Sequence, residues 1–407
     1  MKMEINFRTW FRENYNRVIN SIAFYPAIIA LLFLILSSLS IAFDFSEEGK
    51  QIKYRLHWLR LKDPSTARSI IASIAAGIIS LTVFSFSMVM IVLSQTASQM
   101  SNRILDKLIG SRFQQVVLGI YVGTIVYALF LLSTIRNVDS GVHIPALSTY
   151  LLIGLTICDI FLFIYFLHYI TQSVKYDVII RRIYEETLSA LESSCHADNV
   201  EEEKIPIATK SVILTAKSGV YEGFSSRALL ELCDRENCAI SILHPQGTFL
   251  MEGIPLANVD SCLSQASNKD FQNELYIHQS ESIKENFFYG CRQLTEVGIK
   301  ALSPGINDPG TAIQVLRALF ELYSFRSCHA ANEYIRNREN EVRIIKKELS
   351  FEEVFDATLL PIWDYGKNDR MIRNELKRLL DQMILLAPNI SVSKLLLEVN
   401  RAMDAAG

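Results

Sequence analysis

The chain has 407 residues, of which 50% are hydrophobic and 20% are charged, and its formal net charge is −3. This length allows two or three domains, and the apolar fraction excludes an ordinary soluble protein unless the apolar residues gather in separate segments. The small net charge and the lack of a basic tract argue against a nucleic-acid-binding protein.

The first segment, residues 1–20, interleaves aromatic side chains with arginines in the stretch NFRTWFRENYNRVIN. This mixture is typical of a helix that lies in the membrane interface. We therefore predict an interfacial N-terminal helix over 1–20, followed by a transmembrane domain over 20–175.

Four long apolar segments make up that domain. Three of them contain no Asp, Glu, Lys or Arg, and the fourth contains a single acid, Asp159. A helix needs about 20 apolar residues to cross the roughly 30 Å hydrocarbon core. The sequence therefore predicts four transmembrane helices, near residues 20–43, 69–94, 115–135 and 147–171.

An even number of spans places both termini on one side of the membrane. Lys and Arg flank the spans slightly more often on the side of the termini, which favours cytoplasmic termini. The seven cysteines are odd in number and include no C-x-x-C pair, as expected of free thiols in a reducing cytoplasm. We predict a multi-pass protein with both termini in the cytoplasm.

The second predicted span carries serines at every seventh position. A seven-residue spacing drifts only about 20° around an α-helix, so these serines share one face, with two bulky apolar residues near them. More polar residues extend the face toward the cytoplasm. Small residues typical of helix packing and a water-facing wall both explain the pattern, and both readings stay open. The candidate pore-lining residues are Ser73, Ser80, Phe84, Ser87, Ile91, Ser94, Gln95, Ser98 and Asn102.

Two ionisable residues lie in the fourth predicted span. Asp159 is near its middle, where a charge costs at least about 2.5–3.5 kcal/mol. It is predicted either to bind an ion or proton, or to be protonated and hydrogen-bonded to a neighbouring helix. His168 lies near the cytoplasmic end, where a lone histidine is more often a hydrogen-bonded interface residue than a ligand or sensor.

After the fourth span the spacing of apolar residues changes twice, from a helical to a strand-like pattern and back to a helical one. We predict a connecting helix and linker over 176–204, a small β-rich α+β subdomain over 205–280, and a mainly helical subdomain over 281–407, with an extra strand near 341–349. The predicted fold class is thus an α-helical membrane protein with four transmembrane helices, followed by a cytoplasmic α/β (α+β) domain.

The stretch GIKALSPGINDPGTA is dense in turn-forming residues between two helical segments. A proline stops the first helix, Gly305 is expected to supply a positive φ, and Asp308 and Pro309 are expected as the N-cap and first residue of the second helix. The alternative is an anion site at that helix N-terminus, which Asp308 itself would disfavour. The predicted corner comprises Ser303, Pro304, Gly305, Asn307, Asp308 and Pro309.

Signatures of catalysis and cofactor binding are missing from the sequence. It contains no G-x-x-x-x-G-K-[ST], G-x-G-x-x-G or H-E-x-x-H motif, and its histidines are scattered rather than spaced as metal ligands. We therefore expect no enzyme activity, no cofactor and no metal site.

The chain resembles a family of uncharacterised bacterial predicted membrane proteins, domain of unknown function 2254. The stretches that carry the resemblance are ARSIIASIAAGIISLTVFSFSMVMIVLSQTASQMSNRIL, FLHYITQSVKYDVI, FYGCRQLTEVGIKALSPGINDPGTA and SGVYEGFSSRALLELCDRENCAISILHPQGTFLMEGIPL. The resemblance implies a bacterial inner-membrane protein with four N-terminal helices and a cytoplasmic domain, and it implies no activity. Asp159 is not part of the family pattern.

Two functions follow from these observations. The first is an oligomeric inner-membrane channel-like protein whose second span lines an ion or small-solute pathway, with a cytoplasmic assembly or gating domain. The alternative is a membrane-anchored sensor or scaffold whose cytoplasmic domain binds a ligand or partner protein. The expected partners are the lipid bilayer, other copies of the chain, and an ion or small solute, but not nucleic acid.

Overall fold

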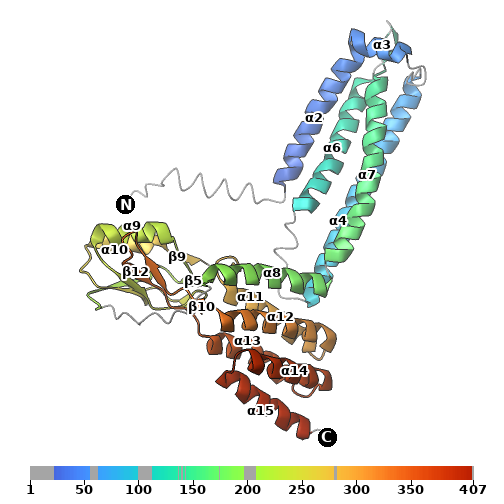
Figure 1. The fold of residues 1–407 in the computed structure, drawn as a ribbon. Coiled ribbons are helices and arrows are strands. Elements are labelled where there is room, and N and C mark those ends of the chain that lie inside the picture. The colour runs from blue at the N-terminus through green and yellow to red at the C-terminus, as the bar shows by residue number, and fades with distance from the viewer. Residues whose placement is uncertain are drawn as a thin grey trace. The chain divides into compact units, whose positions relative to one another are not determined.

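A computed structural model describes residues 23–55, 63–99, 112–135, 137–138, 141–142, 144–173, 175–196, 208–278 and 282–405. The chain divides into two compact units, a membrane unit of residues 1–98 and 102–175 and a second unit of residues 99–101 and 176–407 (Figure 1). The interfacial helix predicted over 1–20 lies outside the described residues.

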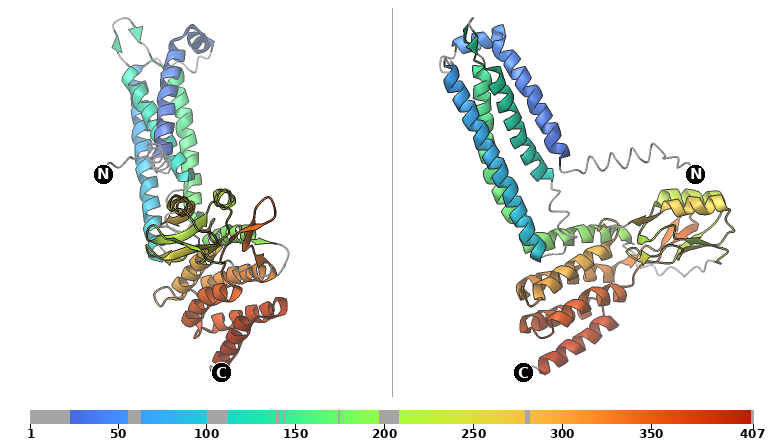
Figure 2. Two further views of the ribbon diagram at one scale, coloured as in Figure 1. Left: turned by 90° about the vertical axis from the view of Figure 1, so that its left-hand side faces the viewer. Right: turned by 180° about the vertical axis from the view of Figure 1, so that it is seen from behind.

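The membrane unit is a bundle of long apolar helices that run side by side (Figures 1 and 2). Its four candidate spans, Phe24–Phe45, Pro64–Val92, Arg112–Thr134 and Ala146–Ser173, confirm the four predicted transmembrane helices. A short helix and a two-stranded hairpin lie at one end of the bundle, here called the loop end. The opposite end, where the fourth span stops, is called the connector end. The elements are α2 (Phe24–Phe45), α3 (Glu47–Arg55), α4 (Pro64–Gln99), α6 (Arg112–Thr134), β1 (Asn137–Val138), β2 (Gly141–Val142) and α7 (Ala146–Ser173).

Helices α2 and α6 make the closest packing in the bundle, because α6 presents two glycines four residues apart. A Cβ atom added at Gly119 would lie 2.6 Å from Ile29 Cδ1, and one added at Gly123 would lie 2.7 Å from the Phe33 ring. Small residues at this spacing let two helix backbones approach within a membrane. The stretch GIYVG therefore fixes how α6 lies against α2.

The second unit contains a β-rich part in which two helices lie side by side on one face of a sheet (Figure 1). Its main sheet has five strands in the order β11-β12-β6-β8-β4, and a smaller sheet has the order β7-β5-β9. The elements are β4 (Ser211–Leu214), β5 (Gly219–Phe224), α9 (Ser226–Glu236), β6 (Ile240–Ile242), β7 (Phe249–Leu250), β8 (Pro255–Val259), α10 (Gln265–Glu274), β9 (Leu275–His278), β11 (Tyr334–Arg336) and β12 (Val342–Ile345).

Two strands of the main sheet come from far along the chain. β12 falls within the strand predicted over 341–349 and pairs in parallel with β6, while β11 pairs antiparallel with β12 at the sheet edge. The short strands β3 (Cys195–His196) and β10 (Ala330–Ala331) pair separately. The β-rich part therefore draws on residues beyond the segment 205–280 that carries most of its strands.

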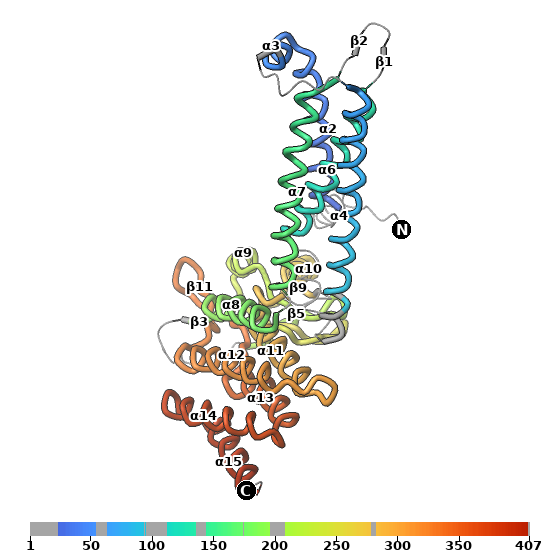
Figure 3. The backbone as a smooth tube through the Cα atoms, turned by 90° about the vertical axis from the view of Figure 1, so that its right-hand side faces the viewer, coloured from blue at the N-terminus to red at the C-terminus, as the bar shows by residue number. Residues whose placement is uncertain are grey.

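The remaining part of the second unit is a stack of helices (Figure 3). Its centre is the fully buried Tyr323, whose hydroxyl lies 2.6 Å from the Thr358 hydroxyl, and Thr295 donates to the Thr358 carbonyl oxygen at 2.8 Å. These bonds satisfy polar groups that burial would otherwise leave unpaired. The helices are α8 (Tyr176–Ser194), α11 (Phe287–Leu302), α12 (Pro309–Cys328), α13 (Phe351–Gly366), α14 (Arg370–Leu386) and α15 (Ile390–Asp404).

Candidate functional site in the membrane unit

The serine face of α4 lies on the outside of the bundle. Ser73, Ser80, Ser87 and Ser94 are all exposed, and the small residues next to them leave the face open, since nothing lies within 4 Å of a Cβ added at Gly77. None of the described helices covers this face over the part of α4 whose side chains are described. Phe84 and Ile91, which were predicted near it, are 54% and 62% exposed. The side chains of Gln95 and Ser98, and all of Asn102, lie outside the described part of the chain.

Two of the exposed serines bond to their own helix. The Ser80 hydroxyl donates to the Ala76 carbonyl oxygen at 3.0 Å, and the Ser87 hydroxyl donates to the Val83 carbonyl oxygen at 2.9 Å. Bonds of this i to i−4 type satisfy the hydroxyl donor without a partner from elsewhere. Each oxygen keeps acceptor capacity that faces away from the bundle, toward whatever covers this face.

The opposite face of α4 packs into the bundle and carries a buried serine that the sequence reasoning missed. Ser85 is 4% exposed, and its hydroxyl has no hydrogen-bond partner. It lies outside the seven-residue repeat, so periodicity gave no reason to select it. Tyr121 of α6 is fully buried, its hydroxyl is likewise unpartnered, and its side chain interacts with Ser85.

Asp159 belongs to the same buried region. It is 1% exposed, and neither carboxylate oxygen has a hydrogen-bond partner. The side chains that interact with it are Tyr121 and Thr124, both on α6. Thr124 already donates to the Ile120 carbonyl oxygen at 3.1 Å. By contrast His168, the other ionisable residue predicted in this span, is exposed at the surface of α7.

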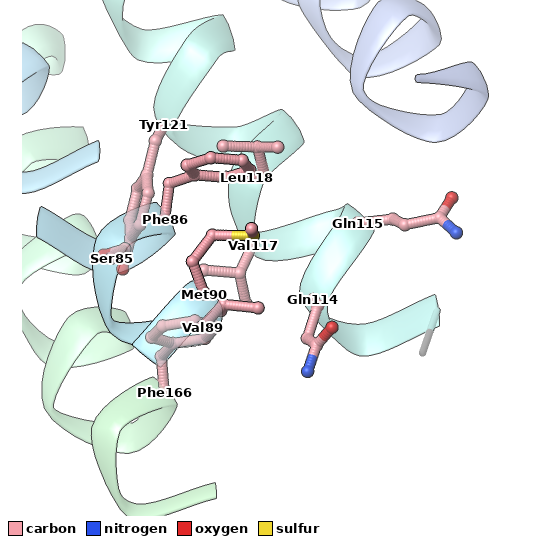
Figure 4. A pocket seen from close by; sticks show the side chains of 10 residues that line it. All are labelled: Ser85, Phe86, Val89, Met90, Gln114, Gln115, Val117, Leu118, Tyr121 and Phe166. Carbon is pink, nitrogen blue, oxygen red and sulfur yellow. The ribbon is translucent and has the colours of Figure 1, made fainter. Parts of the chain in front are cut away.

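An apolar cavity of about 160 Å³ adjoins this buried region in the connector half of the bundle. Its walls come from α4, α6 and α7, and Figure 4 shows the Tyr121 ring pointing toward Ser85 among apolar side chains. Gln114 and Gln115, near the start of α6, also belong to the lining and point away from the apolar walls (Figure 4). The cavity therefore leads from the connector end of α6 to Ser85 and Tyr121.

A second buried acid, Asp44, lies at the loop end and has a full set of partners. One carboxylate oxygen accepts from Lys53 Nζ at 2.7 Å, and the other accepts from the Ser148 backbone N–H at 2.8 Å and hydroxyl at 3.0 Å. Because Ser148 lies in the first turn of α7, Asp44 caps that helix from α2. Tyr127 extends the network, with its hydroxyl 2.7 Å from the Ser40 hydroxyl.

The predicted corner joins α11 to α12 in the second unit. Asp308 is the N-cap of α12, with its carboxylate accepting from the Thr311 N–H at 3.1 Å, and Pro309 follows in the first turn. The positive φ expected at Gly305 is instead found at Asn307, where φ is 48°. The expectation for Gly305 was wrong because asparagine also tolerates the left-handed region, and here the reversal comes immediately before the N-cap.

The rest of the corner is built from backbone bonds. Ser303 is the C-cap of α11, and its carbonyl oxygen accepts from both the Ile306 and the Asn307 N–H, at 3.0 and 2.9 Å. Pro304 and Gly305 lie in the turn between these groups, and nothing lies within 4 Å of a Cβ added at Gly305. The Asp308 carboxylate occupies the N-terminus of α12, where an anion would otherwise bind.

Within the described residues, no group of three or more His, Cys, Asp or Glu side chains could hold a metal ion.

Comparison with known proteins gives one family. The family model described as "Predicted membrane protein (DUF2254)" matches residues 19–382. The chain belongs to this family. It is a multi-pass membrane protein with four candidate spans.

Similar curated proteins come from mycobacteria. Uncharacterized protein Mb1321c of Mycobacterium bovis and uncharacterized protein Rv1290c of Mycobacterium tuberculosis are each 26% identical to the chain over 330 residues. The match covers 78% of this chain and 63% of each relative, so the chain spans less than two thirds of their length. No solved structure matches the chain.

Proposed function

We propose that the chain forms a homo-oligomeric, channel-like protein of the bacterial inner membrane, with both termini in the cytoplasm. In this proposal α4 lines an ion or small-solute pathway between copies, and the second unit assembles or gates it. The observation that supports the proposal is the exposure of Ser73, Ser80, Ser87 and Ser94 along one face of α4.

A pathway between copies fits the bundle better than a pathway through one copy. Fully buried side chains such as Ile71, Tyr127 and Leu131 fill the described interior. The 160 Å³ cavity is lined only by residues from the connector half of the bundle, so it does not cross the bundle from end to end. Cyclic symmetry would bring the α4 faces of several copies around a common axis. The same face would then line the axis in every copy.

The composition of the face suits such a wall. Serine hydroxyls accept hydrogen bonds from water, whereas lipid tails offer them nothing. Phe84 and Ile91 lie near the same face and are largely exposed, as side chains are at a hydrophobic constriction that gates by dewetting, and one edge of the Phe84 ring packs against Phe163 of α7. The face therefore combines polar rings with apolar ones, at a spacing of about two helical turns.

The test measures how single cysteines on this face react in the membrane. Ser73→Cys, Ser80→Cys and Ser87→Cys are treated with a charged, membrane-impermeant methanethiosulfonate in liposomes. The native Cys158, which is exposed on α7 inside a candidate span, serves as the matched lipid-facing control. We expect the serine positions to react at least about tenfold faster than Cys158, since a thiol must be ionised in water to react.

Two other outcomes would overturn the pathway. Equal inertness at the serine positions and at Cys158 means that the α4 face contacts lipid. Inertness combined with efficient copper-catalysed disulfide formation between copies means that the face is a dry subunit interface. Conductance in planar bilayers gives an independent readout, and we expect Ser87→Phe and Ser94→Leu to change it.

A membrane-anchored sensor is the second candidate function, and a cleft in the second unit favours it. This polar cleft of about 1060 Å³ lies beside α9 and the β11–β12 hairpin and includes Arg227, Arg338, Arg343, Glu231 and Asp234 in its lining. If the arginines of this cleft bind a ligand, small anionic metabolites should raise the thermal stability of the whole protein, because a ligand that binds only the folded state stabilises it. A rise that disappears in Arg338→Ala would favour this function, and no rise with any anion would count against it.

A further inference from the structure

Asp159 differs from the other buried acid of the membrane unit in what surrounds it. Lys53 and the Ser148 N–H can only donate hydrogen bonds, so they suit an ionised Asp44 and no other state. The groups beside Asp159 are instead the hydroxyls of Tyr121 and Thr124. None of the ion pairs in the described part of the chain involves Asp159.

Hydroxyl neighbours can serve a carboxyl group in both of its protonation states. A tyrosine or serine hydroxyl donates to a carboxylate, and by rotating its O–H bond it accepts from a carboxylic acid. The Tyr121 and Ser85 hydroxyls are free to do either, because neither is committed to another partner. Tyr121 is the titratable side chain that faces Asp159 from α6, and α4 contributes Ser85, which does not titrate in water.

The free-energy cost of an unpaired charge explains why the Asp159 carboxylate would bind a proton. An ionised carboxylate in the centre of a membrane costs at least about 2.5–3.5 kcal/mol, and more when it lacks a countercharge. Binding one proton removes that charge and turns one oxygen into a donor. Four oxygen atoms lack partners here. After protonation one Asp159 oxygen is a donor, and the other three can act as acceptors. The four atoms are Ser85 Oγ, Tyr121 Oη and both Asp159 oxygens.

The cavity supplies a route to the site. It runs from Gln114 and Gln115 at the connector end to Ser85 and Tyr121, and Tyr121 in turn interacts with Asp159. A tyrosine hydroxyl accepts one proton as it gives up another, so a proton can pass it without Tyr121 becoming charged. The apolar cavity thereby reaches from the connector end of α6 to Tyr121, and the Tyr121 hydroxyl is the polar group between the cavity and the buried carboxyl.

We propose that Asp159, with the hydroxyls of Tyr121 and Ser85, forms an intramembrane site that binds and releases a single proton. A hydronium ion gives its proton to one carboxylate oxygen, one O–H bond forms, and water is released. The site goes beyond the pathway proposed above and does not depend on it, because Ser85 lies on the side of α4 opposite the serine face.

The experiment uses dicyclohexylcarbodiimide, an apolar reagent. The O–H of a protonated carboxyl group adds across one of its C=N bonds, and the O-acylisourea formed rearranges to a stable N-acylurea on the side chain. The whole protein in liposomes is treated at a series of pH values, and mass spectrometry quantifies the adduct at Asp159. Asp44, equally buried but bonded to Lys53, is the matched control in the same sample. We expect a larger fraction of Asp159 than of Asp44 to be labelled at low pH, because Lys53 and the two donors on Ser148 occupy the Asp44 oxygens.

The pH dependence decides between the outcomes. A single proton site predicts that labelling of Asp159 falls about tenfold for each pH unit above its midpoint, and that it recovers when the pH is lowered again. Labelling that is constant across the series means a permanently protonated structural carboxyl, and its absence at every pH means a permanently ionised one. Either result overturns the proposal.

Salt and variants complete the test. Protection by sodium chloride, but not by choline chloride at the same ionic strength, would assign the site to Na⁺ and overturn the proton. Asp159→Asn should abolish the adduct in this peptide while the protein elutes unchanged on size exclusion. Tyr121→Phe should change the pH range of labelling, an effect that a purely packing role for the hydroxyl does not produce.

Discussion

Replacing Asp44 with alanine should destabilise the membrane unit strongly, because this side chain joins three helices. The change removes the acceptor of the Lys53 ammonium and of two donors on Ser148. It leaves the buried Ser148 N–H unsatisfied, at a cost of about 1–3 kcal/mol, and breaking a buried ion pair costs about 3–5 kcal/mol in total. Lys53 is 19% exposed and can turn toward water, so we expect the low end, about 3 kcal/mol.

The measurement is the temperature at which half of the detergent-solubilised protein loses its monodisperse peak. For a unit of this size, about 3 kcal/mol corresponds to a decrease in Tm of roughly 6–12 °C. Glu47→Ala is the matched control, since it removes the exposed Lys50–Glu47 ion pair of the same region and should leave Tm unchanged.

A double-mutant cycle separates the pair from its surroundings. Asp44→Ala and Lys53→Ala together should cost less than the sum of the single changes, by about 0.5–3 kcal/mol, because each single variant strands the other group. If the costs add without any coupling, or if Asp44→Ala melts at the same temperature as Glu47→Ala, the buried network does not stabilise the protein in the way described.

Three further changes test packing, titration and thiol reactivity. Gly123→Ala should cost about 1–3 kcal/mol by driving a methyl group into the Phe33 ring, whereas Gly77→Ala should be neutral in the same melting assay, since a Cβ there meets open space. The hydrogen bond from Asn389, the N-cap of α15, lowers the pKa of Glu352 below its ordinary 4.5. The stability that this bond contributes is therefore present above pH 4.5 and is lost as the pH falls below that value, and a pH series of Tm that is identical for the native protein and Glu352→Gln would contradict this. Burial raises the pKa of the Cys291 thiol to about 12, so N-ethylmaleimide at neutral pH should leave it unmodified in the folded protein while it modifies the exposed Cys262, as peptide mass spectrometry would show.

The transmembrane helices were predictable because lipid imposes one solution on an apolar backbone. Without water in the hydrocarbon core, every N–H and C=O must bond within the helix, so length and apolarity suffice to place a span. The close approach of α6 to α2 was also readable, since GIYVG has the small-x-x-x-small spacing, although the sequence reasoning did not use it. In both cases the signal is local in the sequence.

The buried polar site was not predictable because its parts come from three helices. Asp159 was selected for its charge alone, but nothing in its own span indicates whether it faces lipid or the bundle. Ser85 and Tyr121 become significant only when the rotations of α4 and α6 place them beside each other. Likewise, whether Gly305 or Asn307 would take the positive φ depended on which N–H reached the Ser303 carbonyl oxygen.

The two buried acids of the membrane unit differ in the hydrogen-bond partners of their carboxyl oxygens. Both oxygens of Asp44 accept hydrogen bonds from donors on α3 and α7, so its carboxylate joins these helices to α2 and stabilises the fold. Asp159 is equally buried, yet its neighbours are hydroxyls that match either protonation state, and its two oxygens lack fixed partners. Leaving a buried acid so poorly satisfied reduces stability, and a site that must bind and release a proton requires that both states remain accessible.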